Sequence, residues 1–305
     1  MNRHAGERNT MQERIYLDFN ASTPLAPEVA SAMEQVLREP FGNPSSEHWA
    51  GRPARNAVEK ARVQISDLLS CNPQEVVFTS GGSESNNHAL KGVFFANGKA
   101  GAHIVTTQVE HPAIFSPCRF LERMGAEVTY LPVDGFGRVD PDDVRRAIRP
   151  HTILVSIMHA NNEVGTIQPI ADISSITREH GILFHTDAAQ SVGKVRTRVE
   201  ELGVDLLSIA GHKCYGPKGV GALYVREGVR LEPLIHGAGH ESGRRAGTES
   251  ALWMLVSAPP ARWPNIGSEW NRSGSYVIFS GICCKRDSAI ALFSMAILTL
   301  ACRTR

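Results

Sequence analysis

The sequence lacks an excess of either charge: its 305 residues carry 32 Lys and Arg against 31 Asp and Glu, a formal net charge of +1. A nearly neutral chain has no extended field to attract phosphate groups. The balance therefore argues against nucleic acid, and against an anionic membrane, as the main partner. The chain also does not open with a basic segment followed by an apolar one, so we expect no secretory signal and a cytoplasmic location.

Paired cysteines are also lacking. The six cysteines, at positions 71, 118, 214, 283, 284 and 302, form neither a C-x-x-C pair nor a zinc-binding spacing. We expect reduced thiols and no metal site. The longest apolar run, at residues 288–302, is too short to span a bilayer comfortably.

Three regions differ in pattern. Residues 1–13 are polar and are predicted to be a loose extension. Residues 14–251 alternate between strand-like and helix-like segments. From residue 252 this order is lost, although the stretch holds three of the four tryptophans and three of the six cysteines. We expect residues 252–305 to be an aberrant tail, as a frameshift or truncation would produce.

The ordered region predicts an α/β fold. Strands are expected at 75–79, 103–107, 127–131, 152–158, 182–185, 206–209 and 222–225, and helices at 83–95, 114–124, 141–148 and 170–180. Asp140 is expected to cap the third of these helices, and Gly181 to end the fourth. Such alternation indicates a mostly parallel sheet with helices on both faces, and ligands bind beyond the carboxyl ends of its strands.

A lysine lies at one of these strand ends. Residues 208–219 read SIAGHKCYGPKG, which places Lys213 after an apolar run, in a turn of small residues. A lysine held in this way can form a Schiff base with an aldehyde cofactor. By itself, a lysine after Gly-His is more often a solvated loop residue.

A glycine-rich turn follows the strand at 75–79. The segment TSGGSESNN at 79–87 opens a helix, so its free N–H groups and the Ser83 hydroxyl could hold a phosphate. The alternative is a plain glycine-rich turn with a serine cap.

Four more polar residues follow predicted strands. His111 could stack on a planar ring or transfer a proton. Asn162 could hydrogen-bond a ring oxygen through its amide. Asp187, at a buried strand end, needs a partner such as a protonated pyridine nitrogen, and Gln190 could reach the phenolic oxygen of the same ring. Each alone has a structural alternative: a loop histidine, a polar turn or a capping aspartate. Together with Lys213 and the glycine-rich turn they indicate a pyridoxal phosphate site.

At this level of detail the sequence resembles a known family. The motifs YLDFNASTP at 16–24, FGNPSS at 41–46, VEH at 109–111, HTDAAQ at 185–190 and RRAGTE at 244–249 are similar to those of the class V aminotransferase superfamily. Within this superfamily of fold-type I pyridoxal phosphate enzymes, they resemble the cysteine desulfurases, the NifS/IscS-like group. The resemblance covers roughly residues 14–251, which implies the large domain of that fold, with the small C-terminal domain truncated or replaced.

The resemblance implies a role for each site residue. Lys213 would bind pyridoxal 5'-phosphate covalently, His111 would stack on its ring and aid proton transfer, and Asp187 would pair with the ring nitrogen. Gln190 and Asn162 would address the phenolic oxygen. The phosphate would be held by Gly82, Ser83 and His212, and by Thr248 of a second subunit in a homodimer. Gly211, next to His212, is also expected to be among the cofactor-binding residues. The family often has serine where this chain has Ala210.

The implied reaction converts L-cysteine to L-alanine and passes the sulfur, as a persulfide, to an acceptor such as an iron–sulfur scaffold protein. The nucleophilic cysteine of the family has no visible counterpart after residue 251. Two alternatives therefore stay open at this stage: a selenocysteine lyase-like enzyme of the same superfamily, and a cofactor-binding remnant without sulfur transfer.

Overall fold

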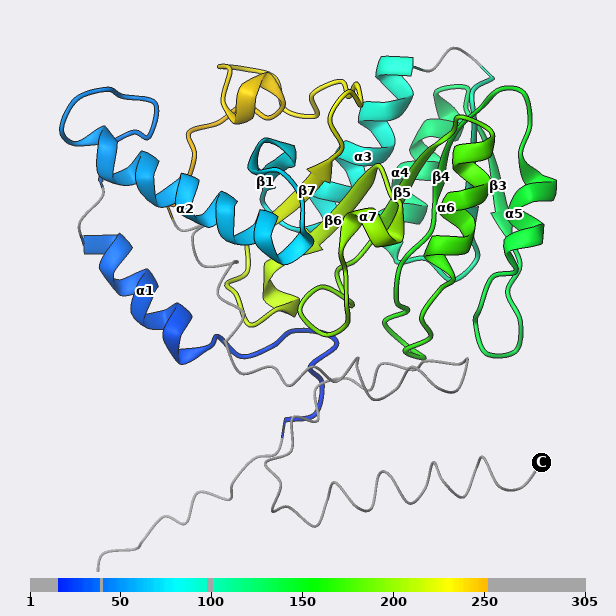
Figure 1. Ribbon diagram of the computed structural model, residues 1–305, viewed down its shortest axis with the longest axis horizontal. Coiled ribbons are helices and arrows are strands. Elements are labelled where there is room, and N and C mark those ends of the chain that lie inside the picture. Colours follow the sequence, from blue (N-terminus) through cyan, green and yellow to red (C-terminus); the bar gives the residue numbers. More distant parts are fainter. Residues whose placement is uncertain (1–15, 39–40, 98–100, 252–305) are drawn as a thin grey trace, which may run out of the picture.

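A computed structural model describes residues 16–38, 41–97 and 101–251 (Figure 1). The predicted extension at 1–13 and the predicted tail at 252–305 lie outside the described residues.

One seven-stranded sheet organises the described chain (Figure 1). Its order is β1-β7-β6-β5-β4-β2-β3. The strands are β1 (Val76–Thr79), β2 (His103–Thr107), β3 (Glu127–Leu131), β4 (Thr152–Ser156), β5 (Leu183–Asp187), β6 (Leu206–Ala210) and β7 (Gly221–Val225). The four pairings among β2 to β6 are parallel, whereas β7 is antiparallel to both β1 and β6. The predicted mostly parallel sheet is confirmed.

The reversed direction of β7 determines which strand ends lie at the same edge of the sheet. Because β7 alone runs backward, β1 points the same way as β6, and the carboxyl ends of the other six strands lie at one edge of the sheet. The chain that enters β7, at Gly219 and Val220, arrives at this same edge. Every polar segment identified in the sequence therefore lies at one edge.

Helices cover both faces (Figure 1). On one face α3 (Gly82–Asn97) and α4 (Pro112–Arg123) contribute to one apolar cluster. On the other, α2 (Gly51–Leu69), α5 (Pro141–Ala147), α6 (Ile170–Glu179) and α7 (Val199–Leu202) contribute to a second. Alternate residues of a strand serve the two clusters, as the pleat requires: Val76 and Phe78 join one, and Val77 the other. In the described part of the chain, no helix is long and apolar enough to cross a membrane.

Several local predictions are confirmed. The Asp140 side chain accepts a hydrogen bond from the Asp142 N–H at 2.9 Å and caps α5. Gly181 follows α6 with a φ of +65°, the left-handed conformation that glycine adopts without a steric penalty. The sequence analysis missed α1 (Pro27–Arg38), α2 and the short α7.

A buried ion pair fastens the end of the described chain to the outer strand. Glu241 accepts hydrogen bonds from Arg62 Nη1 and Nη2 at 2.8 and 2.9 Å, and from the Phe78 N–H at 2.9 Å. Arg62 also donates to the Val76 carbonyl oxygen at 2.7 Å. Since β1 is an edge strand, these two side chains satisfy backbone groups that a neighbouring strand would otherwise pair.

Candidate functional site

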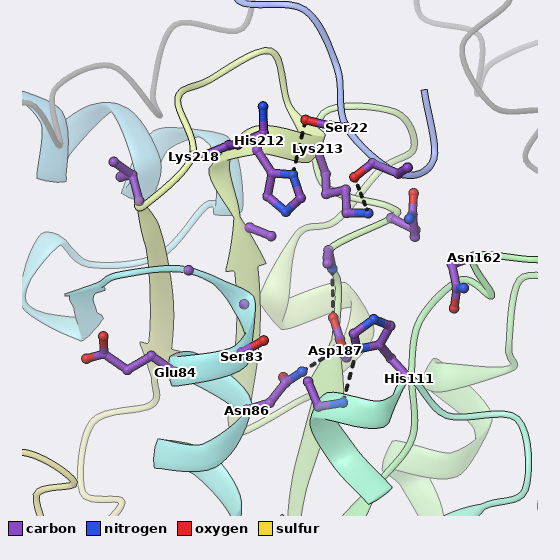
Figure 2. Close-up of a pocket in the computed structure, with 18 of the residues that line it drawn as sticks. Ser22, Ser83, Glu84, Asn86, His111, Asn162, Asp187, His212, Lys213 and Lys218 are labelled. Carbon is purple, nitrogen blue, oxygen red and sulfur yellow. Dashed lines mark hydrogen bonds between the residues drawn. The ribbon is translucent and has the colours of Figure 1, made fainter. Parts of the chain in front are cut away.

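A cavity of about 520 Å³ opens at the edge where the strands end (Figure 2). Its size is within the range usual for small-molecule and cofactor sites. Eight of the ten predicted site residues line it: Gly82, Ser83, His111, Asn162, Asp187, Gln190, His212 and Lys213. They come from the ends of β1, β2, β4, β5 and β6, so the fold brings together segments spread over more than a hundred positions.

The glycine-rich turn forms part of the cavity because β7 passes against it. A Cβ on Gly221 would lie 2.6 Å from the Gly81 Cα, and a Cβ on Gly82 would lie 3.2 Å from the Ala210 Cβ. The first distance excludes a side chain at position 221, and the second would crowd one at position 82. The turn leads directly into α3, whose first N–H groups have no partner within the helix, and Ser83 lies in this first turn (Figure 2). The arrangement suits an anionic group such as a phosphate.

An ion pair holds the glycine-rich turn in place. Glu84 accepts from Arg245 Nε at 2.9 Å and from the Ser80 N–H at 2.8 Å. The two side chains are 9% and 15% exposed, so the pair is shielded from water. Hydrogen bonds from Arg245 and Ser80, acting against the effect of burial, hold the pKa of Glu84 below its usual value.

Asp187 is a buried carboxylate that faces the cavity. It accepts from the Asn86 amide Nδ2 at 2.7 Å and from the Ala189 N–H at 3.0 Å. Burial raises the pKa of Asp187. The Oδ1 of Asn86, itself buried, has no hydrogen-bond partner among the described residues. A buried carboxylate held by neutral donors is costly, and a cationic N–H in the cavity would relieve that cost.

Lys213 lies across the cavity from Asp187 (Figure 2). It belongs to a short 3-10 turn after β6, Gly211–Lys213. Its Nζ donates to the carbonyl oxygens of Asn20 and Ala21, the second at 3.0 Å. Burial lowers the pKa of the Lys213 ammonium, which brings the reactive neutral amine closer to physiological pH.

Gln190 and His212 lie on the same side as Lys213. Gln190 Nε2 donates to the Asn20 carbonyl oxygen at 3.0 Å, and Gln190 Oε1 accepts from Lys194 Nζ at 2.9 Å. His212 Nδ1 lies 3.4 Å from the Ser22 hydroxyl. Burial and the neighbouring lysines lower the pKa of His212. The segment around residues 20–22 therefore supplies oxygen atoms to three predicted site residues.

His111 caps α4 and projects into the cavity (Figure 2). Its Nδ1 accepts from the Ala113 N–H at 3.1 Å, so a neutral ring carries its proton on Nε2. Asn162 also lines the cavity, and its backbone carbonyl oxygen accepts from Asn20 Nδ2 at 3.0 Å.

The aminotransferase class-V family matches residues 15–259. This span includes the whole cavity.

The chain belongs to the aminotransferase class-V family.

Relatives of this class-V domain include the cysteine desulfurase IscS of Dictyoglomus turgidum, 57% identical over 245 residues, which are 80% of this chain and 62% of that protein. The mitosomal cysteine desulfurase of Encephalitozoon cuniculi is 52% identical over 246 residues, 79% of this chain and 57% of that protein. The chain thus spans less than two thirds of the length of these relatives. The predicted resemblance to cysteine desulfurases is confirmed.

Solved structures agree on the fold. A structure of SspA in complex with cysteine has a TM-score of 0.78 and 46% identity, over 80% of this chain and 71% of that one. A NifS-like protein has a TM-score of 0.78 and 41% identity, over 80% and 67%. The predicted fold-type I class is confirmed.

Two predicted residues lie outside the cavity of the class-V domain. Gly211 is buried, and its carbonyl oxygen accepts hydrogen bonds from the Cys214 and Gly216 N–H groups at 2.9 and 3.0 Å, so it shapes the lysine turn. Thr248 is exposed and does not line the cavity. Its predicted role toward a second subunit stays a prediction.

Sequence reasoning missed three residues that support the site. Asn86 holds Asp187, and Lys194 holds Gln190. Glu110 is fully buried beside His111 and accepts from the Met158 N–H at 3.0 Å and from the Thr107 hydroxyl at 2.7 Å. Burial raises the pKa of Glu110 to about 8. Glu110 lies in the polar segment TTQVEHP, so nothing local in the sequence distinguishes it from an exposed turn residue.

Within residues 16–38, 41–97 and 101–251, no cysteine lines the cavity. Burial raises the pKa of Cys71 and Cys118 to about 12 and that of Cys214 to about 11. Reactive thiols have lowered values and access to substrate, so these three are poor nucleophiles. The cysteines at 283, 284 and 302 lie outside the described residues.

Proposed function

We propose that the class-V domain binds pyridoxal 5'-phosphate and uses it to convert L-cysteine to L-alanine, with transfer of the sulfur to a thiol. The observation that carries the proposal is the pairing of Lys213 and Asp187 across one cavity (Figure 2). The relatives named above are cysteine desulfurases, which favours this activity over that of a selenocysteine lyase.

The residues fit the cofactor. Asp187 would hold the positive pyridine nitrogen, which is the cationic partner its buried carboxylate lacks. The first turn of α3, with Gly82 and Ser83, would hold the phosphate together with His212. When bound, pyridoxal phosphate supplies an electron sink for the bonds at the substrate α-carbon.

The protein side chains supply the proton transfers. Lys213, with its lowered pKa, would release a proton from Nζ to become a nucleophilic amine and later carry protons at the same atom. His111 would donate from Nε2, because Nδ1 is occupied by the Ala113 N–H. Asn162 and Gln190 would orient oxygen atoms of the bound groups through their amides.

The sulfur transfer needs a second thiol. In the balanced reaction, L-cysteine and a protein thiol give L-alanine and a protein persulfide. The described residues provide no reactive cysteine at the cavity. We therefore propose that the accepting thiol comes from elsewhere, either from outside the described residues or from an acceptor protein such as an iron–sulfur scaffold. We also propose that the protein is a cytoplasmic homodimer. In this dimer, Thr248 of one subunit would contact the phosphate of the cofactor bound by the other subunit.

Borohydride reduction followed by peptide mass mapping tests the cofactor site. After incubation with pyridoxal phosphate, we expect a single phosphopyridoxyl adduct, on Lys213. The adduct should vanish in Lys213→Ala and persist in Lys60→Ala, which changes an exposed lysine on α2. Adducts spread over several lysines would contradict a dedicated site.

A second measurement tests the reaction. The loaded protein, supplied with L-cysteine and dithiothreitol, should form alanine and sulfide in equal amounts. An adduct on Lys213 without alanine would show a cofactor-binding domain that lacks the sulfur-accepting step.

A further inference from the structure

The side chain of Lys194 contacts the predicted site residue Gln190, which lines the cavity, but Lys194 itself does not line it. It follows Gly193, whose φ of +74° turns the chain back, so Nζ reaches Gln190 Oε1 at 2.9 Å. Its position four residues after Gln190 makes it a neighbour in the turn, not a ligand-binding group.

The two partners of Gln190 fix the orientation of its amide. An ammonium group only donates hydrogen bonds, and a backbone carbonyl oxygen only accepts them. Lys194 therefore requires the Gln190 oxygen on its side, and the Asn20 carbonyl oxygen requires the Nε2 group on the other, at 3.0 Å. A flipped amide would lose both bonds.

This orientation matters because Gln190 Nε2 and Lys213 Nζ donate to the same oxygen atom, the carbonyl oxygen of Asn20. The Gln190 amide and the Lys213 ammonium thus donate to one and the same oxygen position. Without Lys194, the amide could turn and present an acceptor there.

The energetics of Lys194 argue against a purely structural role. Its ammonium is partly buried, and burial lowers its pKa. The charged or titratable groups that act on it are Cys214 and Lys213, and no carboxylate forms an ion pair with it in the part of the chain that the structure describes. A buried cation held by a neutral amide stabilises a fold less than an apolar side chain of similar size would.

We propose that Lys194 is a positioning residue that fixes the amide of Gln190, so that Gln190 and Lys213 present two donors to one oxygen of the bound cofactor or substrate. The inference rests on the proposed function for the identity of that ligand, but the contact between Lys194 and Gln190 does not.

The test compares the full chain with Lys194→Met, Gln190→Leu and the double variant, with Lys60→Met as the control. In the cofactor-free protein, the side-chain amide resonances of Gln190 should shift in Lys194→Met and stay unchanged in Lys60→Met. The melting temperature of Lys194→Met should equal or exceed that of the parent protein. A merely structural lysine would lower the melting temperature instead.

The cofactor-loaded proteins give the second readout. Lys194→Met should weaken pyridoxal phosphate binding about fivefold, the factor expected for one misplaced hydrogen bond, and should shift the pH midpoint of the visible absorption band in the same direction as Gln190→Leu. In the Gln190→Leu background, Lys194→Met should add nothing, because it acts through Gln190. A full effect in that background would overturn the proposal.

The two proposals fail differently. If the parent protein forms no Lys213 adduct, the proposed function is wrong, while shifted Gln190 resonances would still uphold the positioning role. If the adduct forms but Lys194→Met leaves both the Gln190 resonances and the absorption midpoint unchanged, only the role of Lys194 is wrong.

Discussion

The cavity has two walls that are held in different ways. One, the carboxylate wall, consists of Asn86 and Asp187, and its hydrogen bonds come from the protein interior. The other, the lysine wall, consists of Gln190, His212 and Lys213, and its donors meet oxygen atoms of residues 20–22, far away in the sequence. The carboxylate wall is built before a ligand arrives, whereas the lysine wall must exchange partners when one binds.

The largest effect should come from Asp187. Asp187→Asn should lower turnover by at least about a hundredfold, because the pyridine nitrogen of the proposed cofactor would lose its counter-charge. The cofactor-free variant should be no less stable than the parent, since the raised pKa of Asp187 means that the stability it contributes is lost as the pH rises through its folded value. Steady-state kinetics measure the turnover, and urea unfolding at pH 7 measures the stability. The control is Asp172→Asn, which changes an exposed residue on α6. A strong loss of stability with intact turnover would contradict this assignment.

The next largest effect should come from acid, through a histidine on the strand that carries Asp187. His185, two residues before Asp187, is fully buried between the Ser156 and Ser208 hydroxyls, and burial lowers its pKa to about 3. A histidine with a lowered folded pKa contributes stability above its unfolded value, near 6.5, which is lost as the pH falls toward the folded value. The free energy of unfolding should therefore decline between about pH 6.5 and pH 4 by a few kcal/mol. The decline should be shallower in His185→Gln, and an equally steep one would locate the effect in other groups.

The lysine wall should open without global unfolding. The Thr23 hydroxyl donates to the His212 carbonyl oxygen at 3.0 Å and accepts from the Tyr215 N–H at 2.8 Å, which ties the N-terminal segment to the lysine turn. Thr23→Val should cost about 1–2 kcal/mol and raise amide exchange at residues 20–26. Exchange in β5 should stay unchanged, and Ser31→Ala, on an exposed part of α1, is the control. Faster exchange in both places would mean that the two walls are one cooperative unit.

The smallest expected effect is a gain in affinity for the cofactor. Ala210 lines the cavity at the end of β6, where the family often has serine. Ala210→Ser restores one hydroxyl donor for a phosphate and should tighten cofactor binding by about 1 kcal/mol, roughly fivefold. Its Cβ lies close to the place a Gly82 side chain would take, so a crowded hydroxyl would instead weaken binding. Fluorescence titration with pyridoxal phosphate distinguishes the two results.

Local signals explain what could be predicted from the sequence. The seven strands could be predicted because short apolar runs end at polar turns. Most site residues could be predicted because they follow such a run, whereas Thr248 was predicted from the family resemblance alone. Helices α1 and α2 were missed, although α2 buries Ala57, Ala61 and Ile65 along one face. Alanine-rich faces carry a weak hydrophobic signal, and the charged residues of α2 obscured it further.

Contacts between distant segments could not be predicted. Nothing local in residues 20–22 indicates that their carbonyl oxygens accept from Lys213 and Gln190, nor does the sequence around Asn86 indicate a bond to Asp187, 101 positions away. Such pairs depend on the order of the strands in the sheet, and this order differs from their order in the sequence.

The pair of Arg62 and Glu241 has a consequence for how short this protein can be made. All seven strands are complete at Val225, so a fragment ending there would contain the entire sheet. It would also remove the buried Glu241 carboxylate, which accepts from the Arg62 guanidinium and from the Phe78 N–H of the edge strand. Arg62 would keep the carboxylate of Glu59, which is exposed and 3.3 Å from Nε. Removing one partner of a buried ion pair costs about 3–5 kcal/mol, a large share of the stability of an ordinary domain. The minimal autonomous folding unit therefore extends past Glu241, and residues that form no strand decide its boundary.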